Sequence, residues 1–209
     1  MGRKCGCPKP YHCMAFQFFD PTSYDRDTTL LVQADQSGYH EAWISEHITE
    51  TWENAPVPEL LIANALARTE RIILATGVTM LPLHHPVDTA HRIAMLDHMA
   101  RGRFYWGIGV RSLPTDLHLY GVEYHSMDEV RERGKEALEV ILGLWQAEDG
   151  HFGFEGKYYQ VHAPEIDPKL GRRLCTISPT RSPIRPSGSQ LPRRIRTPFA
   201  WLESEAGYL

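Results

Sequence analysis

The stretch Arg103-Phe104-Tyr105-Trp106-Gly107-Ile108-Gly109 is a run of apolar and aromatic residues that ends in two glycines. Unbroken apolar runs are typical of parallel strands that are buried on both faces, so we expect a strand from Phe104 to Ile108. Pro86 suits the first position of a helix, because the missing N–H of proline costs nothing there. A helix from Pro86 to just before Gly102 therefore leads into this strand.

The same alternation of strand and helix runs through the preceding residues. Earlier strands are predicted at residues 14–19, 39–45 and 71–76, and helices at residues 24–37 and from Pro58 onward. Four strands, each followed by a helix, predict an α/β fold with a parallel sheet and right-handed crossovers. The pattern suits either an open doubly wound sheet or half of a (β/α)₈ barrel.

The clearest helix follows the fourth strand. Ser126 and Glu129 form an S-x-x-E capping box, and apolar residues recur behind it at spacings of three and four. Residues 150–161 break the alternation, and their aromatic residues around Glu155-Gly156 predict a β-hairpin.

The residues at the strand ends connect this sequence to a known family. Ligands of parallel βα folds bind at the carboxyl ends of the strands. The motifs at these ends and in the loops are Glu41-Ala42-Trp43, Ser45-Glu46-His47, Ala75-Thr76-Gly77-Val78, Leu81-Pro82-Leu83-His84-His85-Pro86, Gly107-Ile108-Gly109 and Glu155-Gly156-Lys157-Tyr158-Tyr159. In this order, over roughly residues 16–161, they resemble the bacterial-luciferase-like flavin-dependent monooxygenases, and within them the alkanal- and limonene-monooxygenase type.

The resemblance implies a (β/α)₈ barrel. Residues 14–161 would form its N-terminal half, with about the first four βα units and a β-hairpin insertion. It also implies reduced FMN as cofactor, supplied by a separate NAD(P)H-dependent flavin reductase, or a deazaflavin coenzyme as in one branch of the family. The implied reaction uses O₂ to oxidise a small apolar aldehyde, ketone or terpene, while the protein orients the cofactor and excludes water.

His47 is the predicted catalytic residue. By resemblance it matches the first histidine that the family carries after the second strand, near the flavin and the substrate. An imidazole there can exchange a proton near neutral pH. Ile48 stands where the family often has a second histidine, which argues against a mechanism with two histidines. The alternative is a histidine that only caps or closes the loop.

The predicted cofactor-binding residues lie at the ends of the next two strands. Ala75, Thr76 and Gly77 match the segment that passes close to the flavin ring, which small residues permit; the alternative is a buried strand that merely ends in glycine. Beyond the fourth strand, Gly107 and Gly109 match the loop that approaches the flavin. Arg111 suits a phosphate through bidentate hydrogen bonds, although many members have a small residue there.

Other conspicuous side chains are interpreted as structural. Trp43, Trp106 and Trp145 are expected in the core, and Asp116 and Glu123 in solvent. We predict no metal site. His84 and His85 are adjacent and lack the H-x-H or H-E-x-x-H spacing of metal ligands, and the clustered cysteines Cys5, Cys7 and Cys13 fit no zinc pattern.

Residues 162–209 differ in character from the rest of the chain. Between positions 171 and 199 there are seven arginines, several prolines and no acidic residue, which predicts a disordered tail. A family member would continue here through four more βα units. An alternative function follows: a frameshifted or truncated half-barrel that is catalytically incompetent and only self-associates as a homo-oligomer.

Composition excludes several classes of protein. The 209 residues are 42% hydrophobic and 23% charged, with a net charge of −4, so no basic field attracts nucleic acid or an anionic membrane. No apolar run is long enough to span a bilayer, and no apolar segment follows Arg3 and Lys4 as in a secretory signal. The four cysteines are too few for a disulfide framework in a chain of this length, so we expect a protein of the reducing cytoplasm.

Overall fold

The computed structural model describes residues 21–50, 55–147, 151–163 and 179. The strand predicted at residues 14–19 lies outside the described residues, and so does most of the tail predicted at residues 162–209.

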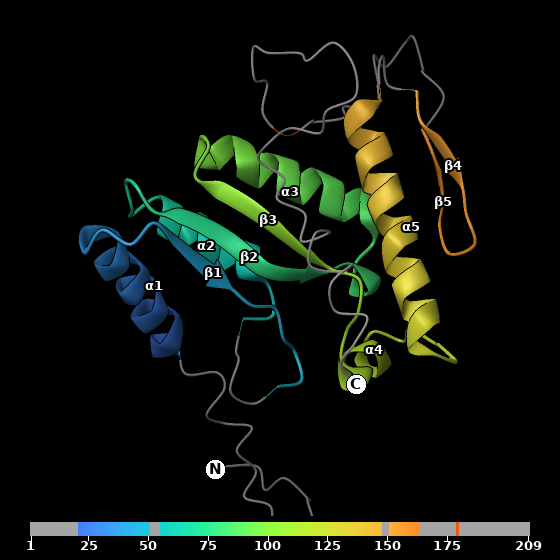
Figure 1. Ribbon diagram of the computed structural model, residues 1–209, viewed down its shortest axis with the longest axis horizontal. Coiled ribbons are helices and arrows are strands. Elements are labelled where there is room, and N and C mark those ends of the chain that lie inside the picture. Colours follow the sequence, from blue (N-terminus) through green and yellow to red (C-terminus); the bar gives the residue numbers. More distant parts are fainter. Residues whose placement is uncertain (1–20, 51–54, 148–150, 164–178, 180–209) are drawn as a thin grey trace, which may run out of the picture.

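Three parallel strands form the described sheet, in the order β1-β2-β3. Their bounds are Glu41–Ile44, Ile73–Met80 and Phe104–Gly109. The sequence α1, β1, α2, β2, α3, β3 confirms the predicted alternation (Figure 1). The helices span Pro21–Gln36 (α1), Pro58–Leu66 (α2) and Pro86–Ala100 (α3), and the short 3-10 helix η2 spans Leu81–Leu83. Strands that are consecutive in the sequence are thus neighbours in the sheet, as consecutive elements usually are.

The starts of α2, α3 and the long helix α5 (Met127–Gln146) follow the sequence signals closely, whereas α1 begins at Pro21, before the predicted residue 24. Both α2 and α3 begin with proline, at Pro58 and Pro86, as predicted. Helix α5 is capped by Ser126, whose hydroxyl accepts a hydrogen bond of 3.3 Å from the N–H of Glu129. The reciprocal half of the capping box differs from the expected one, because the Glu129 carboxylate accepts from the N–H of His125.

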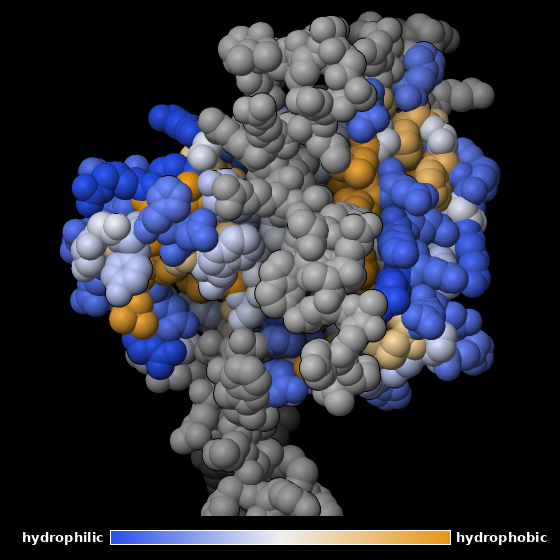
Figure 2. Space-filling model, in the orientation of Figure 1, coloured by the Kyte–Doolittle hydropathy of each residue, from blue (hydrophilic) through white to orange (hydrophobic). Residues whose placement is uncertain are grey.

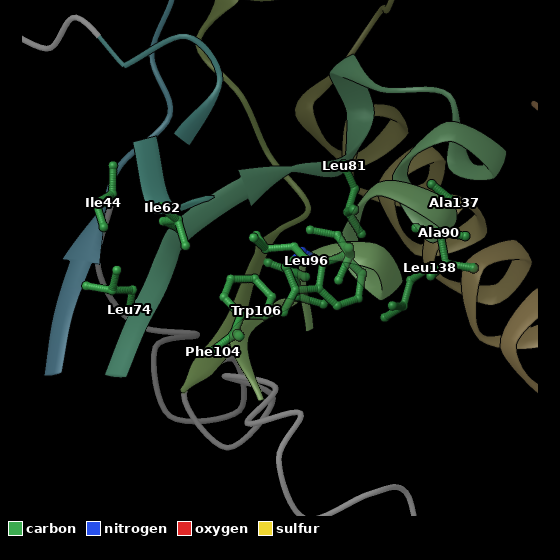
Figure 3. Packing of buried hydrophobic residues seen from close by; sticks show 14 of the residues in the cluster. Ile44, Ile62, Leu74, Leu81, Ala90, Leu96, Phe104, Trp106, Ala137 and Leu138 are labelled. Atoms are coloured by element: carbon green, nitrogen blue, oxygen red, sulfur yellow. The ribbon is translucent and has the colours of Figure 1, made fainter. Parts of the chain in front are cut away.

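One face of the sheet packs against helices. Leu74, Phe104 and Trp106 are at most 3% exposed and contact apolar residues of α2 and α3, as Figure 3 shows. The predicted core positions of Trp106 and Trp145 are confirmed, because their rings meet edge to face at 5.3 Å. The core position predicted for Trp43 is wrong: its side chain is 49% exposed, because strand alternation turns it away from the helices.

Strand β2 is longer than its apolar run suggests. It continues past Thr76 to Met80, with a shift of register between Thr76 and Thr79 and a cis peptide bond between Gly77 and Val78. Beyond the shift, β2 pairs again with β3. The expected end at Thr76 was therefore wrong, because a glycine within a strand marks a bulge as readily as a stop.

The predicted hairpin is present and docks on α5. Strands β4 (Gly153–Glu155) and β5 (Gln160–His162) pair antiparallel. The carboxylate of Glu136 on α5 accepts hydrogen bonds from the backbone N–H groups of Lys157, Tyr158 and Tyr159 at 3.0, 2.8 and 2.7 Å. The side chain of Glu136 thus fixes the hairpin loop to α5.

Replacing Glu136 by alanine should loosen the hairpin loop without unfolding the sheet. Three N–H donors lose their acceptor at once, so we expect amide exchange of Lys157, Tyr158 and Tyr159 to accelerate at least about tenfold. Hydrogen exchange followed by NMR measures this. The control is Glu132→Ala, which removes contacts only to the Lys157 ammonium and the Tyr158 hydroxyl. Equal exchange in the two variants would contradict the assignment.

The surface over α5 and the hairpin is mostly hydrophilic in Figure 2, with hydrophobic residues toward the C-terminal end of α5. Within the described residues, every helix is too short or too polar to cross a membrane.

Candidate active site at the carboxyl ends of the strands

Small and aromatic side chains share the face of the sheet opposite the core. In the register of the strands, Trp43 lies beside Ala75 and Ala75 beside Tyr105, so these three side chains point the same way. Gly77 and Gly107 lie next along this face. A Cβ atom on either would approach Trp43 to 3.1 Å. The exposed indole of Trp43 therefore rests on both glycines and forms a flat apolar surface.

The remaining predicted cofactor residues occupy other positions. Thr76 lies on the core side and is fully buried; its hydroxyl donates to the Gly107 carbonyl at 2.9 Å and accepts from the Gly107 N–H at 3.0 Å. Gly109 ends β3 and packs against Val78, whose Cγ2 would lie 2.7 Å from an added Cβ. Arg111 is exposed two residues beyond the strand. Their contact with a cofactor stays a prediction.

Glu46 ties the loop after β1 to the loop after β2. Its carboxylate is 2% exposed and accepts a hydrogen bond of 2.7 Å from the N–H of Met80. The other carboxylate oxygen lies 2.5 Å from Nε2 of His84, whose ring meets Tyr120 edge to face. Both carboxylate oxygens of this buried side chain thus have a polar partner, as buried polar groups require.

Asp116 ties the loop after β1 to the loop after β3. It lies in helix α4 (Pro114–Leu119) and is fully buried, so the prediction that it is solvated was wrong. Oδ1 accepts hydrogen bonds from the N–H and the hydroxyl of Thr49 at 2.9 and 2.6 Å. Oδ2 lies 3.7 Å from Nδ1 of His47, whose side chain is 24% exposed. The predicted catalytic histidine thus sits between solvent and a buried carboxylate.

The two buried carboxylates also affect Tyr120. Partial burial, and then the negative charges of Glu46 and Asp116, raise the pKa of this phenol above its ordinary value. Tyr120 therefore keeps its proton at neutral pH and remains a hydrogen-bond donor at the edge of the site.

The sequence predicts His47 as the catalytic residue, but it indicates neither of the two buried carboxylates near it, Glu46 and Asp116. Glu46 stands out in the sequence only as part of the Ser45-Glu46-His47 motif, and the prediction for Asp116 is a solvent-exposed position. One signal was available: parallel strands bring their carboxyl ends together, so a polar residue shortly after β3 is a candidate neighbour of His47 after β1. The residue type alone does not distinguish Asp116 from Glu123, which is exposed as predicted.

Fold and site together define a parallel α/β protein that carries its polar groups at the carboxyl ends of the strands. The sequence model of the family described as Luciferase-like monooxygenase matches residues 14–186. The chain belongs to the luciferase-like monooxygenase family, as the motifs predicted.

Individual relatives agree with this membership. The chain is 45% identical over 119 residues to 4-hydroxyprotoasukamycin monooxygenase of Streptomyces nodosus subsp. asukaensis, covering 57% of this chain and 31% of the relative. It is 37% identical over 123 residues to limonene 1,2-monooxygenase of Rhodococcus erythropolis, covering 59% and 31%. A solved structure from Pseudomonas putida, the oxygenating constituent of 3,6-diketocamphane monooxygenase in complex with FMN, is 32% identical with a TM-score of 0.68. That match covers 77% of this chain and 43% of the solved one, so the chain spans less than half the length of these relatives.

Proposed function

We propose that this chain is part of a flavin-dependent monooxygenase that holds reduced FMN at the carboxyl ends of β1, β2 and β3. The substrate would be a small apolar aldehyde, ketone or terpene. The observation that carries the proposal is the exposed indole of Trp43 across Gly77 and Gly107, on the strand that leads to His47. Two of the relatives support the substrate class, because their names specify limonene and a diketocamphane.

The residues of this face fit a flavin. The isoalloxazine ring is flat and largely apolar, and the indole of Trp43 offers an aromatic surface on which such a ring can stack. Because Gly77 and Gly107 have no side chain, the Trp43 indole can lie against the sheet. A larger residue at either position would push the indole away. Arg111, exposed beyond β3, is the predicted residue that would meet the phosphate.

The residues of this chain would bind the cofactor, exchange a proton and exclude water, whereas the redox chemistry would belong to the flavin. When bound, reduced FMN supplies two electrons to O₂, so that one oxygen atom enters the substrate and the other leaves as water. His47 would give a proton to, or take one from, the substrate oxygen near neutral pH. The apolar face around Trp43 would keep water away from the reacting atoms.

The proposal extends to the whole protein. The described sheet would be the first part of a (β/α)₈ barrel, with residues 14–161 as its N-terminal half and residues 162–209 as a divergent tail. The similarity to the FMN-bound structure supports this arrangement. A separate NAD(P)H-dependent reductase would supply reduced FMN, since that relative is described as an oxygenating constituent. A deazaflavin coenzyme is the alternative cofactor and can be compared in the same binding assay.

Replacing Trp43 by alanine should weaken FMN binding by roughly two- to tenfold, because an aromatic contact of this kind contributes roughly 0.5–1.5 kcal/mol. Quenching of FMN fluorescence measures the affinity. The control is Tyr39→Ala, which removes another exposed aromatic ring, 67% exposed, just before the amino end of β1. An unchanged affinity in Trp43→Ala, or an equal loss in both variants, would contradict a flavin site on this face.

A second candidate is the incompetent half-barrel that only self-associates. Within the described sheet, β1 and β3 each have one strand partner, and open strand edges readily pair with another chain. Sedimentation velocity together with substrate-dependent consumption of reduced FMN separates the two candidates. A self-associating chain that binds no FMN supports the second, whereas saturable binding and turnover support the first.

A further inference from the structure

We infer that Asp116 is a positioning residue for His47. The carboxylate of Asp116 would keep a proton on Nδ1 of the His47 imidazole. This inference deepens the proposed function and rests on it for its catalytic meaning. The geometry itself, however, can be tested without any flavin, so the two can fail separately.

The two oxygens of the Asp116 carboxylate have different surroundings. Oδ1 accepts from both the N–H and the hydroxyl of Thr49, and so fastens the loop after β1 to α4. Oδ2 is buried and accepts no hydrogen bond from the residues that the structure describes. It lies 3.7 Å from Nδ1 of His47, within ion-pair range. A buried carboxylate oxygen is costly unless a donor or a positive charge faces it. A proton on Nδ1 of His47 meets this need.

Two other ionisable side chains close to this loop, Glu46 and Tyr120, have interactions of their own. Glu46 is engaged by the N–H of Met80 and by His84. Burial and the negative charges of Glu46 and Asp116 raise the pKa of Tyr120, so its phenol stays protonated at neutral pH. The carboxylate oxygen that lies 3.7 Å from Nδ1 of His47 belongs to Asp116. Which nitrogen of a histidine carries the proton is set by the partner of the ring. With a proton on Nδ1, the neutral ring carries its lone pair on Nε2.

Asp116 has two separate roles in this inference: it fixes the loop after β1 through Thr49, and it orients the His47 ring. Different substitutions remove these roles one at a time. Asp116→Asn keeps an oxygen that can accept from Thr49, but it removes the negative charge and turns one acceptor into a donor. Thr49→Val has the converse effect, because it removes the hydroxyl contact and leaves the carboxylate in place. His118→Gln, at an exposed position of the same helix α4, serves as a further control.

The test is the protonation state of the His47 ring in the flavin-free chain, read from long-range proton–nitrogen NMR spectra. The signals are assigned by their loss in His47→Gln. Spectra are recorded at about pH 8.5, well above the ordinary histidine value of about 6.5. We expect Nδ1 to carry a proton in the wild type, in Thr49→Val and in His118→Gln, and to lose it in Asp116→Asn.

Two results would overturn the inference. One is a wild-type spectrum in which Nδ1 is bare, which needs no variant to fold. The other is the same shift of the His47 signals in Thr49→Val as in Asp116→Asn, which would assign the effect to the loop instead of the charge. Failure of the wild-type chain to bind FMN would instead count against the proposed function.

Discussion

Replacing Gly107 by alanine is expected to destabilise the protein by about 3 kcal/mol, at the upper end of the cost of overpacking. A Cβ atom at this position would lie 2.2 Å from the backbone oxygen of Thr76 and 3.1 Å from the Trp43 ring. The backbone oxygen cannot move away alone, because the Thr76 hydroxyl bonds both the N–H and the carbonyl of Gly107. The new methyl group must therefore separate β2 from β3.

Urea unfolding followed by circular dichroism measures this loss. The matched control is Gly153→Ala, also in a strand, where the nearest atom to an added Cβ is Nδ1 of His162 at 3.9 Å. That variant should unfold within about 0.5 kcal/mol of the wild type, as exposed substitutions usually do. An equal loss of free energy of unfolding in Gly107→Ala and Gly153→Ala would contradict the explanation that the close contact between β2 and β3 requires glycine at position 107.

Replacing Asp35 by alanine should cost a similar amount, about 3 kcal/mol. This carboxylate at the end of α1 is 6% exposed and accepts hydrogen bonds from the N–H groups of Glu70, Arg71 and Ile72 at 2.8, 3.0 and 2.7 Å. The segment that starts β2 relies on these bonds, and alanine would leave its donors without their acceptor. The midpoint of urea unfolding at pH 7 measures the effect.

The stabilisation by Asp35 should depend on pH in one direction. The hydrogen bond from Glu70, followed by those from Ile72 and Arg71, lowers the pKa of Asp35 below its ordinary value of 3.8, although burial opposes the shift. A lowered folded-state pKa contributes stability above the unfolded-state value, and that contribution is lost as the pH falls through the folded-state value. The difference in free energy of unfolding between the wild type and Asp35→Asn should therefore be constant near neutral pH. It should decrease as the pH falls below about 4.

A matched control uses a carboxylate without such bonds. The side chain of Asp128 is 83% exposed in the first turn of α5. Asp128→Asn should change the stability little at any pH, since exposed ion pairs contribute roughly 0–1 kcal/mol. A gap for Asp35→Asn that stays the same down to pH 2 would exclude the proposed role of its charge.

The elements that the sequence predicted correctly are those set by local pattern. The prolines Pro58 and Pro86 mark helix starts because their own geometry favours that position. The capping serine Ser126 acts within one turn of helix. The alternation of strands and helices predicts a parallel sheet in which consecutive strands are neighbours. The three described strands have this arrangement.

The misinterpreted residues are those whose state depends on distant partners. Trp43 is apolar within an apolar strand, and nothing local shows that the helices cover the other face. Asp116 is buried because Thr49, 67 residues earlier in the chain, donates to it. Strand β2 passes Gly77 because β3 pairs with it again beyond the register shift. Each of these outcomes is decided by tertiary contacts that periodicity does not encode.

The most direct test of a flavin site at the carboxyl ends of β1 to β3 is a titration of the wild-type chain with FMN, followed in proton–nitrogen NMR spectra. We predict saturable shifts of the Trp43 indole N–H and of the amides of Gly77 and Gly107, while the amide of Tyr39 at the amino end of the sheet stays unchanged. Shifts confined to residues away from the Trp43 face, or no saturable shift at millimolar FMN, would contradict the account.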